Sequence, residues 1–354
     1  MTQVHNQVNH EENNYLPIED FLLWAEQHGY EIPIEVQERL LSFQWLKDTR
    51  ALKCLFGSQL VKFLGLTDVD LEILNEVYLQ FSPVILRSLT ELNTENSLFF
   101  STGSKNVDEL LKGGIETGHL FEFTGPPASG KTQFCYATLL SCYNKKNNDQ
   151  QGNSIIWLDT EHSLLPSKVK DTIKKLQQND KHLFKFVRIR TFPEFLQAML
   201  ELLKFCQSEY NLRLIIIDSL IAPFDRHYQQ DFPARAQALR ELIGFLKDVC
   251  RVFNCAIIIT NQVRKPHTDA EKETGEKHLP LGGFAFAHAT ENRFLIEPLE
   301  GRRKKLKVLD SSYLPNGETI FYLNKEGIAD VANNNFLDKQ ETCLDSSKEK
   351  RIFD

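Results

Sequence analysis

One short stretch, residues 119–140, limits the fold more than any other part of this chain. It begins with the apolar run HLFEFTG, passes through a turn rich in Gly and Pro, and continues as the helical pattern KTQFCYATLL. The turn matches the phosphate-binding pattern G-x-x-x-x-G-K-[ST] in full, over Gly125–Thr132. A strand is therefore expected before the turn and a helix is expected to open at Lys131.

Strand and helix patterns alternate through the middle of the chain. Apolar, β-branched runs lie at residues 119–125, 154–160, 184–191, 212–219 and 255–263, with helical patterns such as PEFLQAMLELLKFC between them. This alternation predicts an α/β fold with a mainly parallel sheet whose strands are buried on both faces. After Val263 the runs FAFAHAT, NRFLIEPL, KLKVLDS and ETIFYLN predict antiparallel strands at the edge of that sheet.

The two ends of the chain have a different pattern. Helical periodicity appears in IEDFLLWAEQHGY and VDLEILNEVYLQF, whereas the first residues and the last residues are polar. We predict a disordered tail at 1–15, a small helical domain at 16–80, a linker at 81–100, an α/β core at 101–332 and a flexible tail at 333–354.

Composition excludes several classes of protein. The 354 residues are 42% hydrophobic and 25% charged, which is ordinary for a folded soluble chain. No apolar run is long enough to span a membrane, and no secretory signal is expected at the N-terminus. The net charge of −7 excludes a generally basic protein but permits a local basic groove. Seven cysteines without a C-x-x-C motif argue against a zinc cluster or a disulfide framework.

The Gly/Pro turn has the composition that a triphosphate requires. Its glycines let the backbone N–H groups point at phosphate oxygens, and the next helix directs its positive dipole end at the same anion. Lys131 is expected to reach the β- and γ-phosphates, and Thr132 to hold Mg²⁺. The predicted ATP contacts are Gly125, Pro126, Pro127, Ala128, Ser129, Gly130, Lys131, Thr132 and Gln133. The structural alternative is a Gly-rich turn with a stray lysine.

Three polar residues stand at the carboxyl ends of predicted strands, where ligands gather in open parallel sheets. Asp218 ends LIIIDS and could hold the metal; Glu161 follows IIWLDT and could polarise a water; Gln262 ends IIITNQ and could sense a phosphate. Each has a plain structural alternative as a turn or capping residue, and Asp159 competes with Glu161 for its role.

Taken as an ordered set, the motifs of residues 101–330 resemble those of the eukaryotic RecA-like DNA-repair recombinases. The similar segments are TGSKNVDELLKGGIETGHLFEFTGPPASGKTQ, WLDTEH, LIIIDSLIAPFDRHY, PARAQALRELIGFLKDV, IIITNQV, LGGFAFAHATENR and KVLDSSYLPNGETIFYLNKEGIAD. The resemblance implies a RecA-type P-loop ATPase core and a slow DNA-dependent ATPase that uses ATP and Mg²⁺. Lys131, Glu161 and Gln262 match its catalytic positions, and Thr132 and Asp218 match its metal positions. The helical N-terminal region is compatible with the small DNA-binding domain of that family.

The resemblance also implies sites for DNA and for a neighbouring subunit. Single-stranded DNA would run along two loops, at 224–234 and at about 264–283. The implied DNA-binding residues are Arg226, Tyr228, Arg235, Arg264 and Lys265. Asp310 and Pro315 match a cap over the nucleotide of a neighbour, and His288 resembles a histidine that reaches toward a neighbour's γ-phosphate.

The chain departs from the strand-exchange enzymes of that family in four places. The linker SPVILRSLTELN lacks the Phe-x-x-Ala polymerisation motif, and His162 takes a position that is usually glycine. Lys168 replaces an arginine that stacks on adenine, and therefore loses the planar face. The second loop has balanced charge and no aromatic residue, which predicts weak binding to single strands.

These departures favour a recombination paralog, or mediator, that acts in the nucleus, with the cytoplasm as a second location. It would act in a hetero-complex with other RecA-like subunits. IDSLIAPF and LDSSYLP resemble the X-ray repair cross-complementing branch, whereas TGPPASGKTQFC resembles another branch. The alternatives are a strand-exchange recombinase with its own filaments, a scaffold with a structural nucleotide site, and a P-loop ATPase outside recombination. The basic run GRRKKLK at 301–307 is interpreted as a solvated hairpin turn, with a DNA contact or a nuclear import signal as alternatives.

Overall fold

The structure, a computed structural model, describes residues 15–330 with several gaps. The gaps are residues 56–58, 83–96, 145–152, 209–210, 267–277 and 325–326, together with 163–183 apart from three isolated positions. The predicted tails, residue 15 excepted, and most of the predicted linker lie outside the described residues. The five-part division of the chain therefore stays a prediction.

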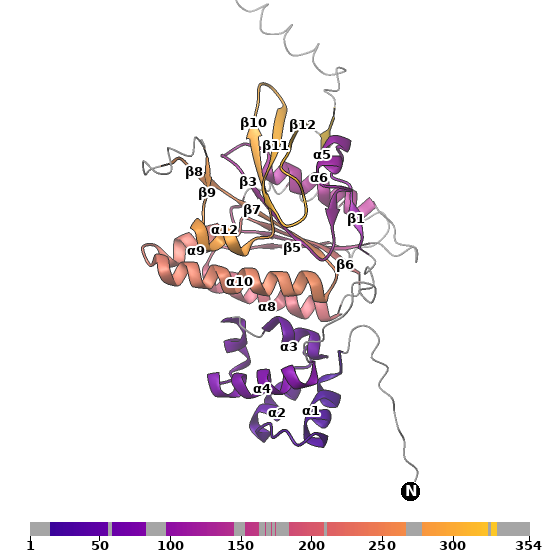
Figure 1. The fold of residues 1–354 in the computed structure, drawn as a ribbon, viewed down its shortest axis with the longest axis vertical. Coiled ribbons are helices and arrows are strands. Elements are labelled where there is room, and N and C mark those ends of the chain that lie inside the picture. The colour runs from indigo at the N-terminus through magenta and orange to yellow at the C-terminus, as the bar shows by residue number, and fades with distance from the viewer. Residues whose placement is uncertain are drawn as a thin grey trace, which may run out of the picture.

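A nine-stranded sheet forms the centre of the core, in the order β13-β12-β11-β10-β3-β7-β6-β4-β5 (Figure 1). Its strands are β3 (Leu120–Thr124), β4 (Ser154–Asp159), β5 (Phe184–Arg188), β6 (Leu212–Asp218), β7 (Ala256–Asn261), β10 (Asn292–Pro298), β11 (Arg303–Ser311), β12 (Glu318–Leu323) and β13 (Ile328–Ala329). Neighbouring strands are parallel from β10 to β5 and antiparallel from β10 to β13. The predicted mainly parallel sheet with antiparallel edge strands is confirmed.

Helices cover both faces of this sheet (Figure 1). They are α5 (Lys105–Leu110), α6 (Lys131–Asn144), α8 (Phe192–Ser208), α9 (Ile221–Tyr228), α10 (Phe232–Val252) and α12 (Gly283–Ala289). Alternate residues of β6 enter different cores: Ile215 and Ile217 pack with the residues of α8, α9 and α10, while Leu214 and Ile216 pack with those of α6. This two-sided burial explains why the strand sequences are continuously apolar. Two short ribbons complete the core, β1 (Phe99–Phe100) with β2 (Ile115–Glu116) and β8 (Val263–Arg264) with β9 (Leu279–Pro280).

Two sequence predictions in the core were wrong. FAFAHAT, predicted as a strand, forms α12, which packs against α10 and buries Phe286. Its Phe-Ala alternation is too short to separate a strand from a helix. The segment 224–234 is also not a continuous loop, because α9 runs to Tyr228 and α10 starts at Phe232.

The basic run at 301–307 is only partly a turn. Its residues from Arg303 onward belong to β11, and Lys305 pairs with Glu297 and Glu318 at 3.0 and 3.4 Å.

The N-terminal helices form a bundle that packs against α8 and α10 (Figure 1). They are α1 (Ile18–Gln27), α2 (Ile34–Ser42), α3 (Thr49–Leu55), the 3₁₀ helix η1 (Gln59–Leu64) and α4 (Asp68–Phe81). Helix α4 starts with a capping box, in which the hydroxyl of Thr67 accepts from the backbone N–H of Asp70 and the Asp70 carboxylate accepts in return. Among the helices of the described residues, none combines the length and apolarity needed to cross a bilayer.

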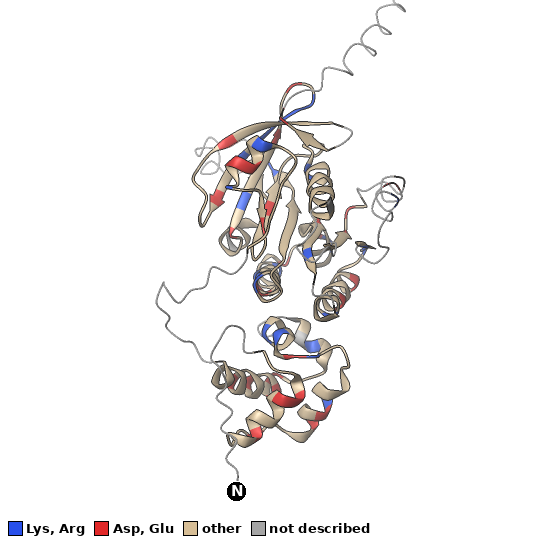
Figure 2. Ribbon diagram, turned by 90° about the vertical axis from the view of Figure 1, so that its right-hand side faces the viewer, with Lys and Arg blue, Asp and Glu red and all other residues tan. Residues whose placement is uncertain are grey.

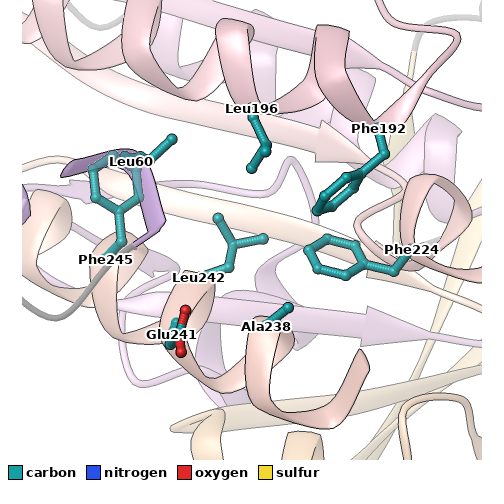
Figure 3. Close-up of a pocket in the computed structure, with 8 residues that line it drawn as sticks. All are labelled: Leu60, Phe192, Leu196, Phe224, Ala238, Glu241, Leu242 and Phe245. Atoms are coloured by element: carbon teal, nitrogen blue, oxygen red, sulfur yellow. The ribbon is translucent and has the colours of Figure 1, made fainter. Parts of the chain in front are cut away.

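Buried contacts join this bundle to the core. The amide oxygen of Gln207, on α8, accepts from the backbone N–H of Lys47 at 3.0 Å, and its Nε2 donates to Asp48 Oδ1 at 2.9 Å. A small apolar cavity lies at the same interface (Figure 3), where Leu60 of η1 meets residues of α8, α9 and α10. Its lining residues are Leu60, Phe192, Leu196, Phe224, Ala238, Glu241, Leu242 and Phe245. The bundle and the helices that carry the predicted first DNA loop therefore share one apolar core.

Candidate nucleotide-binding site

The phosphate-pattern residues form a tight turn between β3 and α6, as the sequence predicts. Gly125 must lack a side chain, because a Cβ there would lie 2.4 Å from the carbonyl oxygen of Ile296 and 2.6 Å from Ser129 Oγ. Gly130 takes a φ of 105°, in the left-handed region that favours glycine. Ala128 also has a positive φ, of 60°. The turn is thus held close to its neighbouring strands, with no room for larger residues at its first glycine.

Lys131 bends back into the turn. Its Nζ donates to the carbonyl oxygens of Gly125 at 2.8 Å and of Pro126 at 3.1 Å. Burial lowers the pKa of this ammonium, while the Glu161 and Asp218 carboxylates act in the opposite direction. A cation inside a curl of backbone at the N-terminus of a helix is the arrangement that binds polyphosphates. The residues present therefore fit an ATP triphosphate.

A hydroxyl and a carboxylate lie together beside Lys131. Thr132 Oγ1 donates to Asp218 Oδ2 at 2.7 Å, and Thr260 Oγ1 donates to the other oxygen of the same carboxylate. Asp218 is buried at the end of β6, and Thr260 comes from the neighbouring strand β7. Mg²⁺ prefers oxygen ligands and takes few of them from the protein in nucleotide sites. The Thr132–Asp218 pair fits that ion, and Thr260 is a site residue that the sequence reasoning missed.

Glu161 is held by two donors at the same edge of the sheet. Ser219 Oγ and Gln262 Nε2 both donate to Glu161 Oε1, each at 2.7 Å. The register explains the meeting, since β4, β6 and β7 are parallel neighbours and each of the three residues closely follows the end of its strand. Asp159, the competing carboxylate, is fully buried and lies 3.5 Å from Arg188. The structure therefore brings Glu161 into contact with Gln262, while Asp159 lies buried beside Arg188.

His162 adopts the backbone conformation of a glycine. Its φ of 58° lies in the left-handed region, and the residue is exposed. A non-glycine residue in this region costs roughly 1–2 kcal/mol. The histidine at position 162 therefore preserves the backbone turn that a glycine would form there. Lys168, the other substitution noted near this position, lies outside the described residues.

The predicted DNA-binding residues have different surroundings. Arg226 is exposed on α9, where its Nη2 donates to the carbonyl oxygen of Thr160 at 3.4 Å. Tyr228 is half-buried against Phe192, and Arg235 pairs with Asp225 at 2.9 Å. Arg264 is half-buried in β8, and Lys265 after it is exposed. Most of the second predicted loop lies outside the described residues, so its DNA role stays a prediction.

The predicted cap residues lie at the opposite end of the parallel strands from the phosphate turn. Asp310 lies opposite Arg293, the second residue of β10, and the chain then continues to Tyr313 beside His119. Asp310 and Pro315 are exposed there, and His288 is exposed on α12. They are thus at the amino end of the parallel strands, whereas Gly125 and Lys131 follow a carboxyl end. Contact of this segment with a neighbour's nucleotide remains a prediction.

The sheet order, the phosphate turn and the carboxylates at its edge define the protein as one with a RecA-type P-loop core. The sequence model of the Rad51 family matches residues 94–331, and the chain therefore belongs to the Rad51 family.

Two relatives show the range of the similarity. The chain is 26% identical over 283 residues to the DNA repair protein RAD51 of Mycosarcoma maydis, covering 77% of this chain and 82% of that protein. It is 31% identical over 237 residues to the DNA repair and recombination protein RadA of Cenarchaeum symbiosum (strain A), covering 65% of this chain. In that second comparison the chain spans 58% of the length of the relative. The protein is thus a recombinase-like relative of DNA repair and recombination proteins.

Proposed function

We propose that this protein is an ATP-dependent, single-strand-DNA-binding mediator of homologous recombination and double-strand-break repair. It would act in the nucleus, within a complex of related RecA-like subunits. The observation that carries the proposal is the convergence of Lys131, the Thr132–Asp218 pair and the Glu161–Gln262 pair at one edge of the sheet. Family membership supports the link to repair, since the similar proteins carry DNA repair and recombination in their names.

The residues at this edge divide the work of phosphoryl transfer to water. Lys131 supplies positive charge inside the turn, and Thr132 with Asp218 supplies oxygen ligands for a metal. Bound Mg²⁺ would offset the negative charge that develops on the phosphates. Glu161 orients a water and accepts its proton, and Gln262 connects this carboxylate to β8, which leads into the second predicted DNA loop.

A neighbouring subunit completes the site in this proposal. Asp310, Pro315 and His288 are exposed at the amino edge of the sheet, where they would cover the nucleotide of an adjacent chain. The isolated chain is therefore expected to hydrolyse ATP slowly. Assembly with related subunits should raise the rate, because it would supply the missing cap.

The sheet edge at β5 supports an interface with such a subunit. Among the described residues, β5 pairs with β4 alone, and Val187 on it is 42% exposed. A groove of about 410 Å³ lies beside it, between the sheet and α8. Its apolar lining residues are Ile156, Leu158, Val187, Ile189, Ala198, Leu202 and Phe205, and its charged or polar ones are Lys185, Arg188, Glu194, Gln197 and Glu201. A strand that pairs on one side only within the described part of the chain, next to a groove with apolar and charged lining, is suited to receiving an extended segment of another chain. We propose that a related subunit docks here.

The test compares the purified protein, alone and with the subunits that co-purify with it from native extract, in the presence and absence of ATP. The mediator function predicts stable hetero-complexes and an ATP-dependent affinity for single strands that Lys131→Ala removes. Absence of DNA affinity with and without ATP, in every assembly, would contradict it. Long filaments of this chain by itself in electron micrographs would instead identify a strand-exchange recombinase. Full partner binding and repair function in Lys131→Ala would identify a scaffold with a structural nucleotide site.

A further inference from the structure

Ser219 contacts Glu161 but has no role in the chemistry proposed for the sheet edge. Its hydroxyl donates to Glu161 Oε1 at 2.7 Å, and the side chain is 1% exposed. Gln262 donates to the same oxygen, so two donors from different strands meet one carboxylate oxygen. Within the described part of the chain, Glu161 has no further hydrogen bond. Its second oxygen, Oε2, is therefore the one left to accept from another group.

The backbone of Ser219 is itself firmly fixed. The N–H of Ser219 donates to Thr160 Oγ1 at 2.9 Å, and the Thr160 hydroxyl donates to the Ser219 carbonyl at 2.6 Å. The N–H of Thr160 also donates to the Asp218 carbonyl at 2.8 Å. These bonds tie the ends of β4 and β6 together, immediately before Glu161. The Ser219 hydroxyl thus projects from a rigid part of the fold toward a carboxylate whose own side chain is exposed.

We propose that Ser219 is a positioning residue for Glu161. It fixes the Oε1 atom of the carboxylate so that Oε2 faces the attacking water, and this role rests on the proposed hydrolysis of ATP. A glutamate side chain has several rotatable bonds, and a carboxylate on the surface would otherwise occupy several orientations. Two donors on one oxygen remove this freedom and leave a single orientation for proton transfer.

The experiment combines a crystal structure with kinetics for Ser219→Ala. In the crystal the Glu161 carboxylate is expected to leave Gln262 or to occupy several positions. In the assembled complex, turnover at saturating ATP is expected to fall by about 10- to 100-fold. Affinity for a fluorescent ATP analogue should be unchanged, because Ser219 donates to Glu161 and not to the residues of the phosphate turn. Ser219→Thr retains the hydroxyl and should restore both the position of Glu161 and most of the turnover.

Two controls separate the possible outcomes. Ser104→Ala removes another buried serine hydroxyl, which caps α5 far along the chain from Glu161, and it should lower the melting temperature without changing turnover per folded molecule. A Glu161 carboxylate that stays on Gln262 in Ser219→Ala overturns the positioning role, whatever the kinetics. The wild-type protein could also hydrolyse no ATP while Glu161 is displaced in the Ser219→Ala crystal. That result would refute the proposed activity and would still support Ser219 as the residue that positions Glu161.

Discussion

The substitution Gly125→Ala tests whether the phosphate turn depends on close backbone packing. The added Cβ would lie 2.4 Å from the carbonyl oxygen of Ile296 and 2.6 Å from Ser129 Oγ, whereas ordinary contacts begin at 3.4 Å. The serine hydroxyl can rotate, but the carbonyl belongs to the backbone of β10, where Ile296 pairs with Leu306 of β11. The turn must therefore move by about 1 Å, a displacement that costs roughly 100-fold in rate when it misplaces a catalytic group.

The stability of the fold should change less than the function. Overpacking of this kind costs about 1–3 kcal/mol, or a few degrees in melting temperature for a core of this size. The assays are ATP turnover, the affinity for a fluorescent ATP analogue and thermal unfolding, measured on the same preparations. Gly244→Ala is the matched control, because it adds the same methyl group on the exposed side of α10 with no atom within 4 Å. If Gly125→Ala binds the analogue as tightly as Gly244→Ala does, the steric reasoning is refuted.

Four further predictions address the nucleotide-binding site, the contact between the helical bundle and the core, the ion pairs of Glu291, and the proposed DNA surface. Lys131→Ala should abolish tight ATP binding, whereas Glu161→Gln should keep the affinity and lose turnover; normal hydrolysis by both variants would show that the site is misassigned. Gln207→Ala removes the bonds to the Lys47 backbone and to Asp48, and should lower the unfolding free energy by about 1–3 kcal/mol in denaturant titrations, with exposed Gln27→Ala as the control. Glu291 has a pKa lowered to about 2 by the His119 imidazole, 3.6 Å away, and by the charges of Lys247 and Arg251, so its stabilising effect should be complete above pH 4.5 and disappear as the pH falls toward 2. The melting-temperature difference between wild type and Glu291→Gln should follow that course, and a difference that grows on acidification would contradict it. Arg226→Ala should weaken binding to single strands and reduce its salt dependence, while equal affinity in Arg226→Ala and wild type would remove Arg226 from the DNA surface.

The sequence predicts those parts of the site whose residue pattern seldom occurs for any purpose other than binding phosphate. A strand, a Gly-rich turn and a Lys-Thr pair seldom follow one another in this order outside phosphate-binding sites. Asp218, Glu161 and Gln262 in turn follow strands whose apolar runs are easy to recognise. Ser219 and Thr260 could not be found in this way. Serine and threonine are common at strand ends, and only the register of β4, β6 and β7 shows which of them meet a carboxylate.

The two wrong predictions in the core have a physical reason as well. A run of seven residues with alternating Phe and Ala fits a strand and a helix equally well, and packing of Phe286 under α10 decided the outcome for α12. The helix α9 was missed because Pro223 follows only two residues after its start, where proline is tolerated. For α12, tertiary contacts selected the conformation, and no local signal in the sequence could replace them.

The distribution of charge favours the core over the helical bundle as the surface that would contact single-stranded DNA. Residues 16–80 contain eleven Asp and Glu against five Lys and Arg, and most of these acidic side chains are exposed. Figure 2 shows the acidic positions in red along the lower helical bundle. Such a bundle repels phosphates at low ionic strength, so its resemblance to a small DNA-binding domain does not extend to its surface charge. Contact with single strands is therefore expected on the core, near Arg226 and Lys265, where cations are exposed. The bundle still affects that contact, because it shares the apolar interface of Leu60 with Phe224 of α9, the helix that carries Arg226.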